Sequence, residues 1–360
     1  MRRALGLGLA AILAVGVLAA IVTSVLKRVQ TTPSLTVVRG VIGSEKQAFF
    51  QDPDVIAVFR NNGLQVQVDT AGSRQIATSV DLSKYDFAFP AGVPAAEKIR
   101  LDRHARTSYS PFYTPMAIAT FRPIVNLLIA AGVAHDNGGG YISLDMKAYL
   151  ALVAKNTRWS DLPNNTTYVT GKSILITSTD IRTSNSAAMY LSIASYVGNG
   201  NNVVQDQTQA AAVLPAVAPV FLRQGFTASS SEEPFGDYLS IGIGKTPMVM
   251  IYEAQFLARA AARDGSITKD MVLMYPSPDV LSKHTVVPLT AAGDRAGQLL
   301  LNDARLQALA TKYGFRTSDP AAFNRFVSSH GLTTPSLVDI VEPPTFDNLE
   351  AMITVIQQQM

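Results

Sequence analysis

Residues 35–47 read LTVVRGVIGSEKQ, and this stretch decides the fold class. The apolar run over Leu35–Ile42 is typical of a buried strand, and Gly43 ends it. Ser44 and Gln47 have the spacing of a capping box, which predicts a helix that begins directly after the strand. A strand followed at once by a helix is the unit from which α/β folds are built.

The same order of strand and helix repeats along the chain. Leu64–Thr70 alternates apolar and polar residues like a strand, and Gly72-Ser73-Arg74 then begins a second helix. Further strands are predicted over 85–89, 116–120, 173–177, 247–252 and 271–275, and further helices over 53–63, 145–155, 186–197, 205–213, 254–263, 294–311 and 346–358. Strands that alternate with helices predict an α/β fold with parallel sheets.

The composition is that of a globular chain with a large core. The 360 residues are enough for two domains, and 48% are hydrophobic against 16% charged, which excludes disordered and fibrous proteins. The sequence contains no cysteine, which excludes disulfides, thiolate metal sites and cysteine nucleophiles. The four histidines, His104, His135, His284 and His330, show no metal-ligand spacing, so neither a metal nor another cofactor is expected.

Residues 1–28 are typical of a membrane anchor. From Ala4 to Leu26 the chain runs for about 23 residues without a charge, which is enough for a helix that spans a bilayer. Arg2-Arg3 and Lys27-Arg28 flank this run. We expect an uncleaved, single-pass transmembrane helix in the cell membrane, with the folded body on the extracytoplasmic side. The alternative is a cleaved signal peptide, whose apolar stretch has about 7–15 residues.

The basic charge of the chain is concentrated in that N-terminal segment. The whole sequence has a formal net charge of +3. Subtracting the four basic residues of 1–28 from the 30 Lys and Arg leaves 26 against 27 acidic residues, a net charge of −1. A nucleic-acid-binding protein is expected to carry a basic patch on its folded part. Nucleic acid is therefore not an expected partner.

Two stretches share a Thr-Pro-Met start followed by an apolar strand, at 114–120 and within 244–252. We expect them to be two crossover hinge strands between two lobes, which close around a ligand by hinge bending. The alternative is two ordinary strands that share a tripeptide. On the hinge hypothesis, residues 29–34 are a linker, 35–115 and 250–317 form lobe I, 116–249 form lobe II, and 318–360 form a C-terminal helical segment.

The polar helix starts are candidates for a ligand site. Ser44, Ser73 and the stretch 179–186 each follow a predicted strand at the beginning of a helix. A helix N-terminus offers free N–H groups and a partial positive charge, and these ends gather at the carboxyl ends of the strands in open α/β sheets. We expect them to converge on one small polar or anionic group, with Arg74 and Arg182 adding charged bonds. The alternative is that these residues are ordinary helix caps.

Several strings, taken in their order along the chain, resemble one family. The chain is similar to the type II periplasmic solute-binding proteins, and more closely to their extracellular branch in Gram-positive bacteria. The similarity covers about residues 35–317, and 318–360 has no counterpart in it. The strings are Gly43-Ser44, Gly72-Ser73-Arg74, Ser178-Thr-Asp-Ile-Arg-Thr-Ser-Asn-Ser186, Ile251-Tyr-Glu-Ala-Gln255, Ser282-Lys-His-Thr-Val-Val-Pro-Leu289 and Gly293-Asp-Arg295.

This resemblance implies a two-lobed α/β fold of the periplasmic-binding-protein type II, here preceded by an N-terminal transmembrane helix. It implies a small-molecule solute in the cleft, with an oxyanion or small carboxylate favoured, delivery to the permease of an ABC importer, and no catalysis. Carried over by position, the residues that would face the ligand are Ser44, Ser73, Arg74, Thr183, Ser184 and Asn185, with Tyr252 and Glu253 near the hinge.

Two other functions fit the same sequence. The fold without solute transport would serve as a surface sensor or an assembly protein, with its interface on the outer lobes or on 318–360. A hydrolase or transferase would use Glu253 or Asp180 as a catalytic carboxylate. Catalysis also needs a nucleophile and a base that meet in space, and no such pair can be read from the sequence. We therefore predict a binding protein and not an enzyme.

Overall fold

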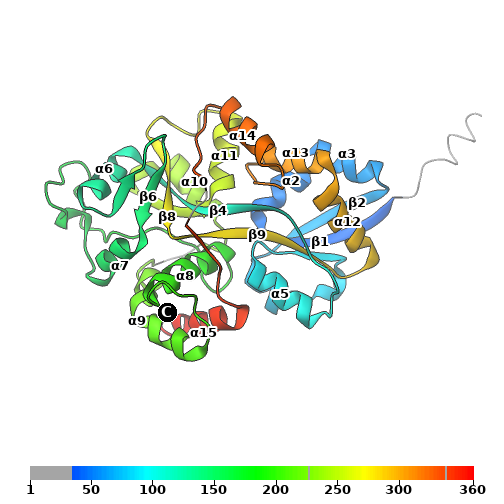
Figure 1. Ribbon diagram of the computed structural model, residues 1–360, viewed down its shortest axis with the longest axis horizontal. Coiled ribbons are helices and arrows are strands. Elements are labelled where there is room, and N and C mark those ends of the chain that lie inside the picture. Colours follow the sequence, from blue (N-terminus) through cyan, green and yellow to red (C-terminus); the bar gives the residue numbers. More distant parts are fainter. Residues whose placement is uncertain (1–34, 226–227, 337–338) are drawn as a thin grey trace, which may run out of the picture.

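Two long strands, β4 (Tyr109–Phe121) and β9 (Asp279–Pro288), run side by side through the middle of the molecule and join its two lobes (Figure 1). They pair antiparallel, with Tyr109 opposite Val286 and Pro115 opposite Leu281. The computed structural model describes residues 35–225, 228–336 and 339–360. All its long strands belong to one sheet, in the order β2-β1-β3-β9-β4-β8-β6-β5.

The first lobe is built on one end of this sheet. There β1 (Thr36–Ile42) pairs in parallel with β2 (Leu64–Thr70) and β3 (Phe87–Phe89), and β3 pairs antiparallel with β9. Alternate strand residues face two separate cores, one on each side of the sheet. The helices of this lobe are α2 (Gln47–Gln51), α3 (Pro53–Asn61), α4 (Ser73–Thr78), α5 (Val93–Asp102), α12 (Ala291–Asn302), α13 (Ala304–Lys312) and α14 (Pro320–Ser329), with short 3-10 turns η1 (Ser44–Lys46) and η2 (Leu82–Lys84).

The second lobe is built on the other end of the sheet. Its strands are β5 (Ala134–Asp136), β6 (Ile142–Asp145), β7 (Met248–Tyr252) and β8 (Met271–Ser277), together with the second half of β4. The predicted strand over 173–177 is an extended segment that makes only single bridges, to Arg158 and to Val249. The remaining elements are α6 (Arg122–Ala130), α7 (Met146–Ala154), α8 (Asn185–Gly198), α9 (Gln207–Leu222), α10 (Glu232–Ser240), α11 (Glu253–Ala262), η3 (Trp159–Asp161) and η4 (Gly242–Gly244).

The sheet is mixed, whereas the sequence pattern predicted parallel sheets. The pairs β1–β2, β1–β3 and β6–β8 are parallel, but β4 pairs antiparallel with β7, β8 and β9. An apolar strand pattern does not say in which direction the neighbouring strand runs. The sheet is mixed because the long central strands pair antiparallel, and the alternation of strands and helices does not predict those strands.

The two lobes divide the chain differently from the expected boundaries. Along β4 the core changes between Phe112, which packs in the first-lobe core, and Met116, which packs in the second-lobe core. The other Thr-Pro-Met strand, β7, pairs with β4 inside the second lobe, and β8 joins the same core. The return crossing in the sheet is β9, where Val280 packs with the second lobe and Val286 with the first. Residues 271–275 therefore lie in the second lobe rather than in lobe I.

The C-terminal residues return to the second lobe. β10 (Ile340–Val341) pairs with β9, and α15 (Phe346–Gln358) packs against α9 and α8 (Figure 1). Leu349, Met352 and Ile356 of α15 are buried in the second-lobe core. α9 continues through Pro215 and Pro219, well beyond the predicted end at 213. Each proline removes a helix hydrogen bond, and burial of the helix among its neighbours offsets this cost.

The predicted anchor over 1–28 and the linker over 29–34 lie outside the described residues. Within 35–360, apart from the two short gaps, no helix is long and apolar enough to cross a membrane.

Candidate functional site

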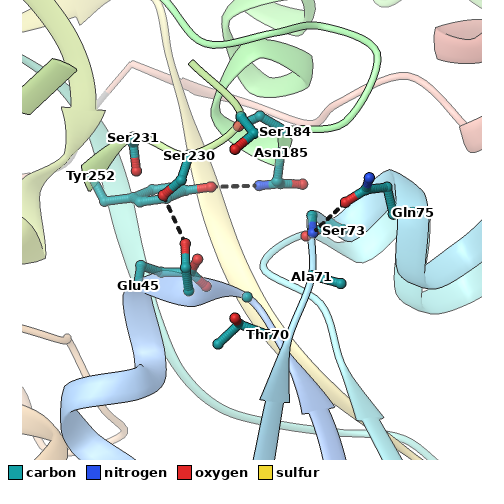
Figure 2. A pocket seen from close by; sticks show the side chains of 14 residues that line it. Glu45, Thr70, Ala71, Ser73, Gln75, Ser184, Asn185, Ser230, Ser231 and Tyr252 are labelled. Carbon is teal, nitrogen blue, oxygen red and sulfur yellow. Dashed lines mark hydrogen bonds between the residues drawn. The ribbon is translucent and has the colours of Figure 1, made fainter. Parts of the chain in front are cut away.

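Four helix starts meet at one cavity between the two lobes (Figure 2). Its volume is about 190 Å³, which holds several water molecules or one small solute. The first lobe contributes the starts of η1 and α4, and the second lobe those of α8 and α10. We call it the serine cavity. Its lining residues are Gly43, Ser44, Glu45, Thr70, Ala71, Gly72, Ser73, Gln75, Ser184, Asn185, Ser229, Ser230, Ser231 and Tyr252.

The two first-lobe starts lie together because β1 and β2 are parallel neighbours. Ile42 at the end of β1 pairs with Thr70 at the end of β2, so both chains turn into helices at the same edge of the sheet. At the second start, the backbone N–H of Gly72 donates to Gln75 Oε1 over 3.1 Å. A Cβ atom on Gly72 would collide with the backbone carbonyl oxygen of Thr183 in the other lobe. Glycine is therefore needed here for the close approach of the lobes.

Ser73 faces the serine cavity with its position fixed by the backbone. Its Oγ accepts a hydrogen bond from the N–H of Ala91 over 2.9 Å, and only 3% of the residue is exposed. A hydroxyl group has one proton to donate besides the lone pairs that accept. The proton of Ser73 is thus available for a group in the cavity.

The second lobe contributes the N-terminus of α8, which has 14 residues. Ser184 occupies its N-cap position, yet its hydroxyl makes no capping bond to the helix backbone and instead contacts Ser186 Oγ over 3.2 Å. Asn185 donates from Nδ2 to the Tyr252 hydroxyl over 3.1 Å and to Ser282 Oγ over 3.4 Å (Figure 2). Burial raises the pKa of Tyr252 well above its usual value, so this hydroxyl keeps its proton. The N-terminus of α8, with the partial positive charge of the helix end, therefore lies at the cavity.

Ser229, Ser230 and Ser231 were not among the predicted site residues. They precede α10, and Ser231 occupies its N-cap position. Ser230 Oγ and Ser44 Oγ are 2.9 Å apart, a hydrogen bond that joins the second lobe to the first across the cavity (Figure 2). Three serines followed by two glutamates form a helix-start signal that was present in the sequence.

Glu45 is a charged residue in this lining, and its charge is balanced beneath the cavity. It forms an ion pair with Lys46, which is fully buried, and it lies 3.4 Å from His284 Nδ1. Burial alone would raise the pKa of Glu45, but the Lys46 ammonium and the His284 ring hold it far below its usual range. Burial, and then the charge of Lys46, lower the pKa of His284 to about 4, so the ring is neutral. The group as a whole adds no net charge to the cavity.

Five of the eight predicted site residues line the serine cavity: Ser44, Ser73, Ser184, Asn185 and Tyr252. The other three do not.

Arg74 points away from the cavity toward the C-terminal helix. Its Nε donates to Glu350 over 2.8 Å and its Nη1 to the carbonyl oxygen of Arg182 over 2.8 Å. Arg182 is itself paired with Asp180, with Nε 2.8 Å from Oδ1. Neither guanidinium is thus free to serve as the countercharge that was expected in the cavity. The partner of Arg74 comes from α15, which follows it by more than 270 residues.

Thr183 and Glu253 also have structural partners. The hydroxyl of Thr183 donates weakly, over 3.4 Å, to the carbonyl oxygen of Asp180 in its own turn. Glu253 is completely buried and accepts from Arg316 Nε over 2.7 Å and from the Tyr275 hydroxyl over 2.7 Å. Their polar atoms are thus bonded inside the protein and outside the lining of the serine cavity, and a ligand contact at either residue stays a prediction.

Comparison with solved structures finds proteins that match this chain over most of its length. The chain is similar to a sulfate-binding protein from Mycobacterium tuberculosis, with a TM-score of 0.52 and 15% sequence identity over 90% of this chain and 99% of that chain. This chain has the fold of the type II periplasmic solute-binding proteins. The resemblance expected from the sequence strings is thereby confirmed at the level of the fold.

Two further solute-binding proteins of this fold overlap equally well. A periplasmic thiamin-binding protein has a TM-score of 0.51 and 12% identity over 90% of this chain and 96% of that chain. The apo ferric ion-binding protein A of Pasteurella haemolytica has a TM-score of 0.52 and 12% identity over 90% and 97%. No protein-family model and no curated protein matches the chain. Because the three named solutes differ in charge and size, the type of solute has to be argued from the lining of the cavity.

Proposed function

We propose that this protein is an extracytoplasmic solute-binding protein that holds a small, polar, anionic solute in the serine cavity. The observation that carries this proposal is the meeting of four helix starts, two from each lobe, at one cavity of about 190 Å³. On this proposal the protein binds its solute and releases it unchanged.

The lining favours an anion because it brings hydroxyl groups together with helix starts. Serines from both lobes and the first residues of α8 line the same space. A helix N-terminus carries about half a positive charge, which stabilises a negatively charged group close to it. Since Glu45 is neutralised by Lys46, it opposes this field only weakly. Backbone and hydroxyl donors would thus hold the anion without a direct ion pair.

Contact between the lobes supports a mechanism in which they close around the solute. Ser44 and Ser230 come from different lobes and already bond to one another, and β4 and β9 are the strands about which the lobes would bend. A solute that bonds to both lobes stabilises only the closed arrangement, and binding therefore shifts the protein toward it.

The anchor and the partner belong to the same proposal. The uncharged run over Ala4–Leu26 would hold the protein in the cell membrane, with the body on the extracytoplasmic side, where it would deliver its solute to the permease of an ABC importer. Deleting residues 1–28 is expected to move the protein from the membrane fraction to the soluble fraction without changing the affinity for the solute. Recovery of the shortened protein in the membrane fraction would contradict this part of the proposal.

Native mass spectrometry of the freshly purified protein tests the binding function. We expect a population with one small molecule per chain, whose mass identifies the solute class. If the cavity is empty and no anion, amino acid or sugar raises the melting temperature, the proposal fails. A surface sensor or assembly protein would then be the better description, and the partner recovered from membranes would identify it.

A further inference from the structure

A second cavity opens beside the serine cavity and shares two of its walls. Its volume is about 300 Å³, and Glu45 and Tyr252 line both cavities. We call it the lateral cavity. It lies between α2 of the first lobe and α10 and α11 of the second, and the segment Tyr313–Phe315 lines it as well. The two cavities therefore adjoin one another, with Glu45 and Tyr252 as their common wall.

The walls of the lateral cavity differ in chemistry from the serine cavity. Phe235, Leu239, Ala254, Ala258 and Phe315 make much of its surface apolar. Apolar walls with a few polar groups at fixed positions are typical of sites for organic molecules. The lateral cavity thus suits the carbon skeleton of a solute whose anionic group lies among the serines.

A carboxylate is held at a fixed position in this apolar wall. Gln255 is 9% exposed, and its Oε1 accepts from the backbone N–H of Tyr252 over 3.0 Å. This bond orients the amide so that its Nε2 donates to Glu232 Oε1 over 2.6 Å. Glu232 is exposed and lines the lateral cavity, and it has a second oxygen, Oε2, to offer a ligand.

The charges around Glu232 leave it without a full ionic partner. Of the other charged groups of this lining, Glu45 is paired with Lys46, and Arg259 is paired with Asp264 over 3.0 Å, although its charge also acts on Glu232 and lowers the pKa of that carboxyl. Burial, and then the negative charge of Glu45, raise the pKa of Glu232. A cation placed in the lateral cavity would relieve this cost and bond to the oriented carboxylate.

Glu232 is also close to the serine cavity. It follows Ser230 by two residues, and its backbone N–H donates to Ser230 Oγ over 3.3 Å. Two residues of chain span at most about 7 Å. The Cα atoms of Ser230 and Glu232 therefore lie within about 7 Å of one another, a separation comparable to the length of a molecule with two or three carbon atoms between its charged groups.

We infer that the solute is zwitterionic, with a compact anionic group in the serine cavity and an ammonium group bound to Glu232 in the lateral cavity. This inference rests on the proposed function and names the class of solute. On this inference, Glu232 distinguishes an anion that carries an amine from an anion without one. Gln255 holds the Glu232 carboxylate in position.

Matched pairs of probes test the inference on the full-length protein. Taurine and propanesulfonate differ by an ammonium group in place of a methyl group, and so do phosphoethanolamine and propyl phosphate. Calorimetric titration is expected to show that the amine-bearing member of at least one pair binds about tenfold or more tightly. Glu232→Gln should reduce this preference to about twofold or less. Glu233→Gln, which changes the neighbouring carboxylate on the same helix outside the lining of the lateral cavity, should leave it unchanged.

The outcomes separate the inference from the proposed function. If the anions bind but the ammonium group brings no advantage, or if Glu232→Gln keeps the preference, the inference is overturned while anion binding stands. If sulfate, phosphate and all four organic anions fail to bind, the proposed function is overturned and the inference with it.

Discussion

Arg74 and Glu350 form an ion pair that joins the first lobe to the C-terminal helix. Arg74 follows the cavity residue Ser73 in α4, and its Nε lies 2.8 Å from Glu350 Oε2. Both side chains are partly buried, with 24% and 28% exposed. Because α15 is buried in the second-lobe core, this pair connects the two lobes beside the serine cavity. The side chain that was expected to bind the solute thus has a partner on the other lobe.

Weakening this pair should reduce affinity without removing a contact to the solute. A partly buried ion pair contributes about 1 kcal/mol, so Glu350→Gln is expected to weaken solute binding roughly fivefold by lowering the population of the closed arrangement. Titration calorimetry measures the loss. Glu97→Gln removes an exposed pair with Arg100 inside α5 and serves as the control. Equal affinities for the two variants would show that the Arg74–Glu350 pair has no part in closure.

Glu253 is expected to stabilise the fold and to leave binding unaffected. Glu253→Gln would leave the Arg316 guanidinium, which is 12% exposed, without its countercharge. Breaking a buried ion pair in this way costs about 3–5 kcal/mol, which urea denaturation measures. Glu342→Gln, which breaks an exposed pair with Lys283, should cost less than about 1 kcal/mol. A variant of Glu253 that kept its stability but lost affinity would instead place this carboxylate in the binding site.

Stability should depend on pH through His284. Below its unfolded pKa of 6.5 the unfolded chain takes up a proton on this ring, whereas the folded protein stays neutral down to about 4. The free energy of unfolding is therefore expected to decrease as the pH is lowered, by about 2 kcal/mol from pH 7 to pH 5. Urea denaturation at both pH values measures this difference.

Two histidine variants separate this effect from other titrations. In His284→Asn the free energy of unfolding should lose most of its pH dependence. Because position 284 is buried, the substitution also makes the variant less stable overall. His135→Asn, in which an exposed ring is replaced, should keep it. If the His284 variant retains the full slope between pH 7 and pH 5, another group is responsible.

Local sequence signals predicted the helix starts well. Asp52 followed by Pro53 begins α3 as expected, with the Asp52 side chain accepting from the N–H of Asp54. β2 has the bounds that its alternating pattern predicted. These features depend on a few neighbouring residues, and for that reason a single sequence contains the information. Ser44, Ser73 and Ser184, at three of the four helix starts around the serine cavity, could likewise be found from their neighbours in the sequence.

Features that depend on distant partners were not predictable. The direction of the Arg74 side chain is set by Glu350, and the C-terminal segment had no recognisable pattern that placed α15 between α9 and α5. The lobe to which β8 belongs depends on its pairing with Ile118 and Thr120 of β4. Ser230 bonds to Ser44 over a separation of 186 residues. In each case the signal lies in the packing of the chain and not in the pattern of neighbouring residues.

Thermal unfolding with an anion panel tests the central claim most directly, on the wild-type protein and on two triple variants. Ser44→Ala, Ser184→Ala and Ser230→Ala together remove hydroxyls of the serine cavity. Ser79→Ala, Ser160→Ala and Ser328→Ala remove three exposed hydroxyls as a control. At an anion concentration near one hundred times the Kd, binding adds about 2.7 kcal/mol of stability.

We predict that at least one anion stabilises the wild-type protein and the control. The cavity variant should need more than about a thousandfold more of it, because three lost hydrogen bonds to a charged group, at about 1.5–3 kcal/mol each, together cost at least about 4.5 kcal/mol. If no anion stabilises the wild-type protein, or if the cavity variant is stabilised as strongly as the control, the serine cavity does not bind an anionic solute.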